Sequence, residues 1–126
     1  MLNVRVVAKT AIPRIPFKEI AGAILGSSYE LSLAFVGDTR MQALNKAHRG
    51  KDKPTNVLSF PYDEQDGEII IDARLVKKEA QAQGRAYRDY MSYLFIHGCL
   101  HLKGYDHGHI MEDKETQYMR QFNLKE

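Results

Sequence analysis

Hydrophobic and polar residues alternate in two segments near the start of the chain. Residues 2–8 read Leu-Asn-Val-Arg-Val-Val-Ala, and the segment 30–36 places Leu31, Leu33 and Phe35 at every second position. A period of two is typical of a β-strand with one buried face. The pattern therefore predicts a strand over each segment.

Two further strands are predicted in the middle of the chain. Pro54 and Pro61 bracket the segment 56–61, which suits the edge of a sheet because proline cannot donate to a strand ladder. Acidic residues and a glycine over 63–67 indicate a turn. The strand that follows, 69–71, consists of three isoleucines, so we expect it to be covered on both faces.

Hydrophobic residues three and four positions apart predict five helices elsewhere. Pro16 suits a first helical position, Asp72 suits an N-cap, and glycines stand where several of these segments end. The element order β-α-β-α-β-β-α-α-α indicates the α+β class, with a small four-stranded mixed sheet packed with about five helices in a single domain over 1–126. The predicted helices cover 16–26, 38–49, 72–84, 87–103 and 111–122.

Composition narrows the class of protein. A chain of 126 residues with 44% hydrophobic and 27% charged residues is ordinary for a soluble globular domain. No apolar run approaches the length of a membrane span, and the N-terminus lacks the charged-then-apolar layout of a signal peptide. The single cysteine, Cys99, excludes an internal disulfide framework. We therefore expect a cytoplasmic protein with no membrane partner.

Charge is distributed unevenly along the chain. Residues 1–60 carry nine Lys or Arg against four Asp or Glu, whereas residues 61–126 carry nine against twelve. A basic side built from the first half would attract phosphate groups. A solvated surface is the simpler explanation of so modest an excess, so the charge alone selects no function.

The strongest chemical pattern is the run His-Gly-Cys-Leu-His-Leu-Lys-Gly-Tyr-Asp-His at residues 97–107. On a helix, His97 and His101 lie one turn apart on one face, so both imidazoles can reach one ion. Gly104 suits a left-handed turn that brings His107 round as a third ligand. Three protein ligands with an open fourth position are typical of catalytic zinc, whereas structural zinc usually has four. The pattern predicts a metal site at the end of a central helix.

Two alternatives compete with this site. Histidines on an apolar helix can simply pack in the core, but three histidines and a glycine at ligand spacing favour a metal. The spacing also occurs in the metallopeptidase motif H-E-x-x-H-x-x-G-x-x-H, yet this chain has Gly98 in place of the catalytic glutamate. A peptidase is therefore disfavoured. His109 is an additional candidate ligand, whereas His48 and Cys99 are expected to be packing or solvated residues.

The histidine run resembles the signature H-G-x-L-H-L-x-G-Y-D-H of the YbeY family of rRNA-maturation factors. Segment 49–61, Arg-Gly-Lys-Asp-Lys-Pro-Thr-Asn-Val-Leu-Ser-Phe-Pro, is similar to a second signature of that family, as is the strand Gly-Glu-Ile-Ile-Ile to a third. The resemblance covers about residues 29–122. The chain differs at Glu68, where the family usually has Asp, at His48, where it usually has Tyr, and in a short loop at 62–66.

The resemblance implies a single-strand-specific endoribonuclease that acts in 16S rRNA 3′-end maturation and ribosome quality control. Its partners would be a single-stranded rRNA precursor and the ribosome or small-subunit proteins. The resemblance also implies one zinc ion per chain, held by His97, His101 and His107, with a catalytic Arg49 facing it in a basic cleft. A ribosome assembly factor with a structural zinc is the non-enzymatic alternative.

Elementary chemistry gives roles to the remaining candidates. A metal with an open position lowers the pKa of bound water and polarises a phosphoryl oxygen. Arg49, Lys51 and Lys53 can hold RNA phosphates, and Ser59 can contact one. Asp106 either acts as the general base or orients a ligand histidine, while activated water or the RNA 2′-hydroxyl would need no protein base. The native metal stays open, because nickel and other ions also bind imidazole.

Overall fold

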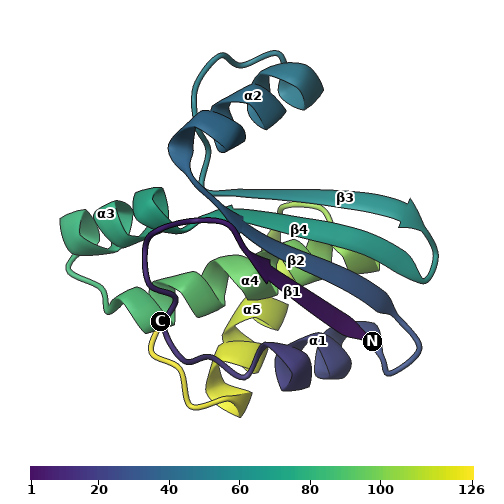
Figure 1. Cartoon of the computed structure of the whole chain (residues 1–126). Helices are drawn as coiled ribbons and strands as arrows, with labels where there is room; N and C mark the ends of the chain where they lie inside the picture. The colour runs from purple at the N-terminus through teal and green to yellow at the C-terminus, as the bar shows by residue number, and fades with distance from the viewer.

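A computed structural model describes residues 1–126 and contains one mixed sheet (Figure 1). Its strands follow the order β1-β2-β4-β3, with β1, β2 and β4 parallel and β3 antiparallel to β4. The predicted α+β class, with four strands and five helices, is confirmed. The helices all lack the combination of length and hydrophobicity that a bilayer span requires. The elements are β1 (Leu2–Val6), α1 (Phe17–Leu25), β2 (Glu30–Val36), α2 (Asp38–Arg49), β3 (Val57–Asp63), β4 (Asp66–Asp72), α3 (Ala73–Gln83), α4 (Tyr87–Lys103) and α5 (His109–Gln121).

The hairpin of β3 and β4 is longer than its sequence pattern predicts. β3 continues through Pro61 to Asp63, and β4 begins at Asp66, so the turn is shorter than the predicted 63–67. Pro61 is tolerated because β3 is an edge strand with a neighbour on one side only. The polar start of β4 is extended because it pairs with β2 as well as with β3. In this hairpin, hydrogen bonding between strands decides where the strands end, rather than the local amino-acid composition.

One face of the sheet carries the main hydrophobic core. Alternate strand residues point to this face, α1 and α4 lie against it, and α5 packs on α4 (Figure 1). α4 occupies the centre of this layer, since it packs against α1, α3, α5 and β3. The core therefore fixes the position of whatever side chains the end of α4 presents. The strand residues of this core are Leu31, Leu33, Phe35, Ile69 and Ile71, each at most 2% exposed.

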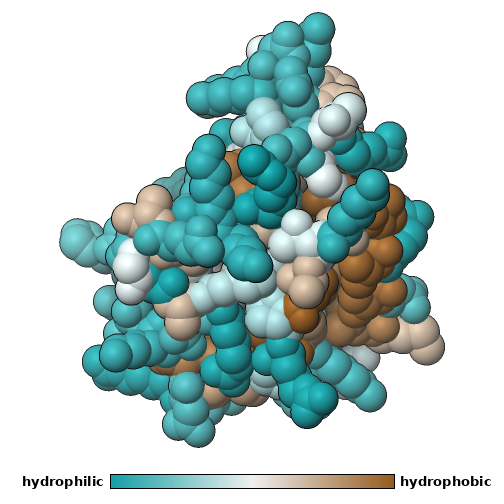
Figure 2. All heavy atoms as spheres, turned by 60° about the vertical axis from the view of Figure 1, so that its left-hand side comes forward, coloured by the Kyte–Doolittle hydropathy of each residue, from teal (hydrophilic) through white to brown (hydrophobic).

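The opposite face of the sheet is covered only in part, by α2. Ile70 faces this side while Ile69 and Ile71 face the main core, so β4 is covered on both faces as predicted. α2 projects from the body in Figure 1 and forms a largely hydrophilic projection at the top of Figure 2. It rests on the sheet through a small cluster of Ala34, Val36, Met41, Leu58 and Ile70.

β1 forms the second edge of the sheet and is largely exposed. Val4 and Val6 point to the same side as the main core, because they pair in register with Leu33 and Phe35. They are nevertheless 50% and 55% exposed. Figure 2 shows a hydrophobic band on the side of the molecule where this strand lies.

Two carboxyl groups meet where β2 and β4 end. Asp38 begins α2, and Asp72 is the N-cap of α3, where it accepts from the Leu75 backbone N–H at 3.2 Å. Asp72 is fully buried, and burial together with a hydrogen bond to the Asp38 carboxyl raises its pKa to about 6. Arg74 donates to the outer oxygen of Asp38 at 3.0 Å. Because the inner oxygens Asp38 Oδ1 and Asp72 Oδ2 have no other partner, a shared proton satisfies both.

Candidate metal centre

Three histidine side chains converge at the C-terminal end of α4. His97 and His101 project from the helix, and His107 comes from the loop that follows it. One nitrogen from each ring lies within 4.8 Å of the others. The ring centres are 4.5, 4.8 and 5.1 Å apart. The structure thus brings together the three ligands that the spacing predicts.

The return of the chain toward the helix depends on Gly104. This residue ends α4 in the left-handed conformation at φ 108°, which glycine adopts without strain. Its N–H donates to the His101 carbonyl at 3.0 Å, and the Tyr105 N–H donates to the Leu100 carbonyl at 3.0 Å. These bonds close the helix end and direct His107 back toward the other two rings.

Each helical histidine is oriented through its Nδ1 atom. His97 Nδ1 donates to Glu115 Oε2 at 2.5 Å, and His101 Nδ1 donates to the Tyr105 carbonyl at 3.1 Å. A carbonyl and a carboxylate can only accept, so both Nδ1 atoms carry the hydrogen. The Nε2 lone pairs are left pointing into the site, which is the tautomer that a metal ligand needs.

The resulting donor set fits a metal ion. Nε2 of His97 and Nε2 of His101 face each other at 3.1 Å, and in neutral rings neither carries a hydrogen. A proton or a metal ion held between the two nitrogens would satisfy both lone pairs at this distance. Nitrogens held at about 2.0–2.1 Å by a tetrahedral zinc lie roughly 3.3 Å apart, close to the observed distance. Three imidazoles with an open fourth position therefore suit zinc.

Electrostatics favour the neutral form of His101. Burial lowers the pKa of this imidazole, and repulsion from His97 and His107, which acts when those rings are protonated, lowers it further. The Tyr105 carbonyl and the Asp106 carboxylate act in the opposite direction and are outweighed. Neutral imidazole is the form that binds a metal, so the site is prepared for one near neutral pH.

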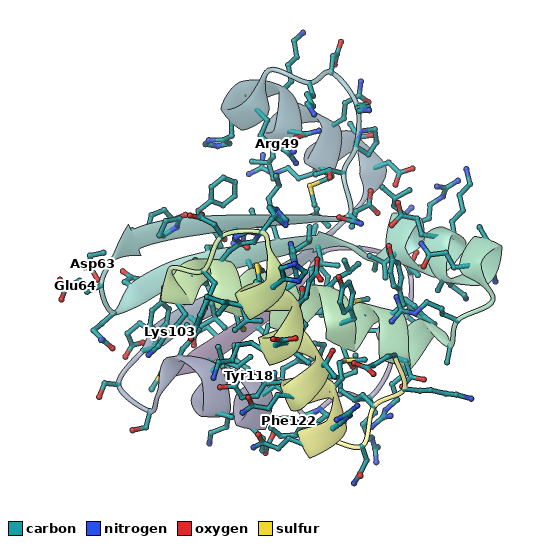
Figure 3. All side chains as sticks on the ribbon, turned by 180° about the vertical axis from the view of Figure 1, so that it is seen from behind. Arg49, Asp63, Glu64, Lys103, Tyr118 and Phe122 are labelled. Carbon is teal, nitrogen blue, oxygen red and sulfur yellow. The ribbon has the colours of Figure 1, made fainter.

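The histidines line one wall of a cleft of about 490 Å³. Arg49, at the C-terminal end of α2, lies across this cleft from them, in the position shown in Figure 3. It is exposed and forms no ion pair, so its guanidinium is available to a ligand. Ser59 lies beside the metal ligands, and its hydroxyl donates to the Gly98 carbonyl at 3.4 Å. The second wall consists of Arg49, Thr55, Asn56, Val57, Leu58 and Ser59.

The other residues proposed from the sequence lie outside this cleft. Lys51 and Lys53 are exposed in the loop that leads from α2 toward it. Asp106 is also exposed, and its charge acts on His101 from the loop beside His107. His109 begins α5 and does not join the histidine cluster. Their chemical roles stay predictions.

Glu115 is the site residue that sequence reasoning missed. It is 6% exposed, on α5, and both Met111 and Met119 on the same stripe are buried. A carboxylate within an otherwise hydrophobic stripe at i, i+4 and i+8 indicates a buried partner, because an unpaired buried charge is costly. That pattern was the available signal, and the partner is His97.

Gly98, where the metallopeptidase motif has its glutamate, is closely packed against the sheet. A Cβ added to Gly98 would lie 3.0 Å from Ser59 Oγ and 3.1 Å from Ile69 Cδ1. α4 therefore approaches β3 and β4 so closely that a side chain at position 98 would have to displace Ser59 and Ile69. This packing disfavours the glutamate of the metallopeptidase motif, which argues against that alternative. Cys99, beside it, is buried in the core, and burial raises the pKa of its thiol.

Fold and site together define a class of small α+β proteins in which an open three-histidine centre faces an arginine across a cleft. A model of the family described as endoribonuclease YbeY matches residues 8–125, and the chain belongs to that family. The resemblance predicted from the two signatures is thus confirmed.

Two known proteins place the chain within this group. A Colwellia psychrerythraea protein named endoribonuclease YbeY is 46% identical over 103 residues, which cover 76% of this chain and 64% of that protein. The chain therefore spans less than two thirds of that relative's length. The solution structure of TM1509 from Thermotoga maritima is similar with a TM-score of 0.70 at 25% identity, and covers 97% of this chain and 89% of that one.

Proposed function

We propose that this chain is a zinc-dependent, single-strand-specific endoribonuclease that acts in the cytoplasm on the 3′ end of 16S rRNA and in ribosome quality control. Family membership and the name of the Colwellia relative support ribonuclease activity. The resemblance of the two signatures supports the finer choice of substrate. The ribosome or its small-subunit proteins would then be partners of the chain.

The observation that carries this proposal is the placement of Arg49 opposite the histidines in one cleft. A phosphodiester needs cationic groups on two sides, since charge builds up on the nonbridging oxygens and on the leaving oxygen during cleavage. A planar guanidinium can donate two parallel hydrogen bonds to a phosphate. The cleft supplies that group on one wall and the ligand nitrogens on the other.

The chain's own residues have distinct tasks in this mechanism. His97, His101 and His107 would hold the zinc, and Glu115 with the Tyr105 carbonyl keeps two of the rings in the binding tautomer. When bound, zinc supplies an acidic water and a Lewis acid for a phosphoryl oxygen. Arg49 binds and stabilises the phosphate across the cleft.

Polar residues around the cleft complete the proposed substrate contacts. The Ser59 hydroxyl lies in the cleft wall, where it can donate to a phosphate oxygen. Lys51 and Lys53 lie outside, and would bind phosphates further along the strand. None of the residues that line the cleft is a carboxylate, so Asp106 would have to act from the adjoining loop, as a base or on a ligand histidine.

The test is cleavage of an end-labelled RNA that spans the 3′ end of 16S rRNA, with and without a duplex across the cut region. The zinc-loaded chain is expected to cut the single-stranded form, and the identically purified His101→Ala variant is expected to leave it intact. That variant controls for contaminating nuclease. Uncut RNA with the metal-loaded chain, or equal cutting by both preparations, would overturn the proposal.

A further inference from the structure

The sheet face beneath α2 has an uncovered half. α2 rests on the row that contains Ala34, Leu58 and Ile70, where β2 and β4 approach their C-terminal ends. In the next row only Phe60 packs against the α2 cluster, and all four residues of the row are exposed or half-buried. A hollow of about 210 Å³ lies over its β1 side. This row runs in register across all four strands as Asn3, Ser32, Glu68 and Phe60.

Aromatic rings gather on the β3 side of this uncovered half. The His48 ring, exposed on α2, lies 4.7 Å from the Phe60 ring, centre to centre, at 54°. Tyr62 is 61% exposed, and its hydroxyl donates to Glu68 Oε1 at 2.6 Å, which places the ring over the same face. We call the surface formed by His48, Phe60, Tyr62, Glu68 and Ser32 the β3 platform.

The β3 platform begins where the metal cleft ends. Val57, Leu58 and Ser59 line the cleft, and Phe60 is the next residue of the same strand. Alternate residues of a strand are about 6.8 Å apart, so Phe60 and Tyr62 offer successive ring positions to a chain that leaves the cleft along β3. Ser59 faces α4 and Phe60 faces the other side of the sheet, so a strand that leaves the cleft reaches the platform by passing the free edge of β3.

The charges around the β3 platform select the part of a nucleic acid that can lie on it. Glu68 lies on its floor and repels phosphate, but a carboxylate accepts hydrogen bonds from the amino groups of bases. The cations lie on and after α2, where Arg49 and Lys51 are exposed. This arrangement suits bases against the sheet and phosphates toward α2.

We propose that the β3 platform is a second contact site for single-stranded RNA, on which unpaired bases stack against Phe60, Tyr62 and His48. Stacking needs free base faces, which a duplex does not offer, so the site also selects single strands. The inference rests on the proposed function for the identity of the ligand, and extends it from the scissile phosphate to the strand beyond the cleft.

Binding without cleavage tests the β3 platform separately from catalysis. The His101→Ala chain serves as background, and the probe is a fluorescein-labelled single-stranded RNA of about twelve nucleotides, followed by anisotropy. Adding Tyr62→Ala or His48→Ala is expected to weaken binding at least about fivefold each. Tyr62→Phe keeps the ring and loses only the bond to Glu68, so its affinity is expected to match the background. Val6→Ala, at an exposed apolar residue on the other face, is the second control.

The outcomes distinguish this inference from the proposed function. Equal RNA affinity in the background, Tyr62→Ala and His48→Ala chains overturns the platform, even if the wild-type chain cuts RNA, and leaves the surface to a protein partner. Weakened binding in both alanine variants supports the platform, even if the wild-type chain cuts nothing. Thermal unfolding of each variant shows that the fold is retained, as expected for exposed side chains.

Discussion

The two walls of the cleft are held in different ways. The histidine wall stands on α4, which is packed on several sides within a core cluster of 24 buried residues, and its ligand atoms are oriented by Glu115 and a backbone carbonyl. Of the residues on the other wall, which we call the arginine wall, Arg49 stands on α2, and α2 rests on the sheet through a cluster of five buried residues. Arg49 itself is exposed and has no ion-pair partner.

The two walls therefore differ in whether folding alone fixes the positions of their functional side chains. The histidine wall is arranged by folding alone, since its tautomers and ring positions are set by groups within the chain. The arginine wall is not arranged in this way, because no acidic group in the chain pairs with the exposed guanidinium of Arg49. Changes on the first wall should therefore alter stability and metal binding, and changes on the second should alter turnover alone.

The largest expected effect is on the histidine wall, at Gly98. Gly98→Glu forces a side chain against Ser59 and Ile69 and buries a charge, which should cost more than about 3 kcal/mol and leave little folded protein. Gly22→Glu is the matched control, because Gly22 is also helical and a Cβ there meets nothing within 4 Å. Circular dichroism and urea unfolding measure both. Equal stability of the two variants would show that α4 is not packed as described.

On the arginine wall, Arg49→Ala is expected to lower the rate of RNA cleavage by about 10²–10³ while the metal content and unfolding temperature stay unchanged. Arg49→Lys should recover only part of the rate, since an ammonium cannot make the paired contact. Arg40→Ala, exposed on the same helix but outside the cleft, is the control. A fall in metal content in Arg49→Ala would contradict the separation of the two walls.

A smaller effect is expected from the group that orients His97. Glu115→Gln keeps the shape and removes the charge, so zinc affinity should fall about 10–100-fold with the fold intact. Competition with a chromogenic chelator measures the affinity. Glu112→Gln, exposed on the same helix, should bind zinc as the wild type does. Wild-type affinity in Glu115→Gln would leave the buried carboxylate with a packing role only.

The smallest expected effect is on the pH dependence of stability, which the carboxyl groups of Asp38, at the start of α2, and Asp72 should determine in part. The pKa of Asp72 rises from 3.8 to about 6 on folding, so the folded chain holds a proton that the unfolded chain releases. Stability from this group is present at low pH and is lost as pH rises from about 4 to 6. Asp38→Asn removes the like charge beside Asp72, so this variant should lose less stability than the wild type as pH rises. The unfolding temperature of the variant minus that of the wild type should therefore increase by about 5 °C between pH 4 and pH 6. Thermal scans at each pH test this, and a constant difference would contradict the shared proton.

Much of the fold was predictable from the sequence, because the spacing of hydrophobic residues along the chain indicates which segments are strands and which are helices. Alternation marked β1 and β2, and the Asp72 N-cap and several glycine stops marked helix ends. The errors lie at ends, where β1 stops at Val6, α5 starts at His109, and the β3–β4 turn is shorter. There, pairing between strands and packing between helices decide the boundary, and neither is visible in a local window.

The candidate site also contains residues that the sequence predicted and residues that only tertiary packing brings together. The three histidines lie within eleven residues of one another, so spacing on one helix and one turn was enough to place them together. Glu115 lies 18 residues from His97, and only the packing of α5 on α4 joins the pair. The β3 platform likewise depends on how much of the sheet α2 leaves uncovered, which no motif encodes.

The most direct test of the central claim is the metal content of the purified chain by elemental analysis, for the wild type and for His97→Ala, His101→Ala and His107→Ala. The account predicts about one zinc ion per wild-type chain and loss of that ion in each variant. A wild-type chain without metal, or an ion that survives all three changes, would contradict it and return these histidines to the core.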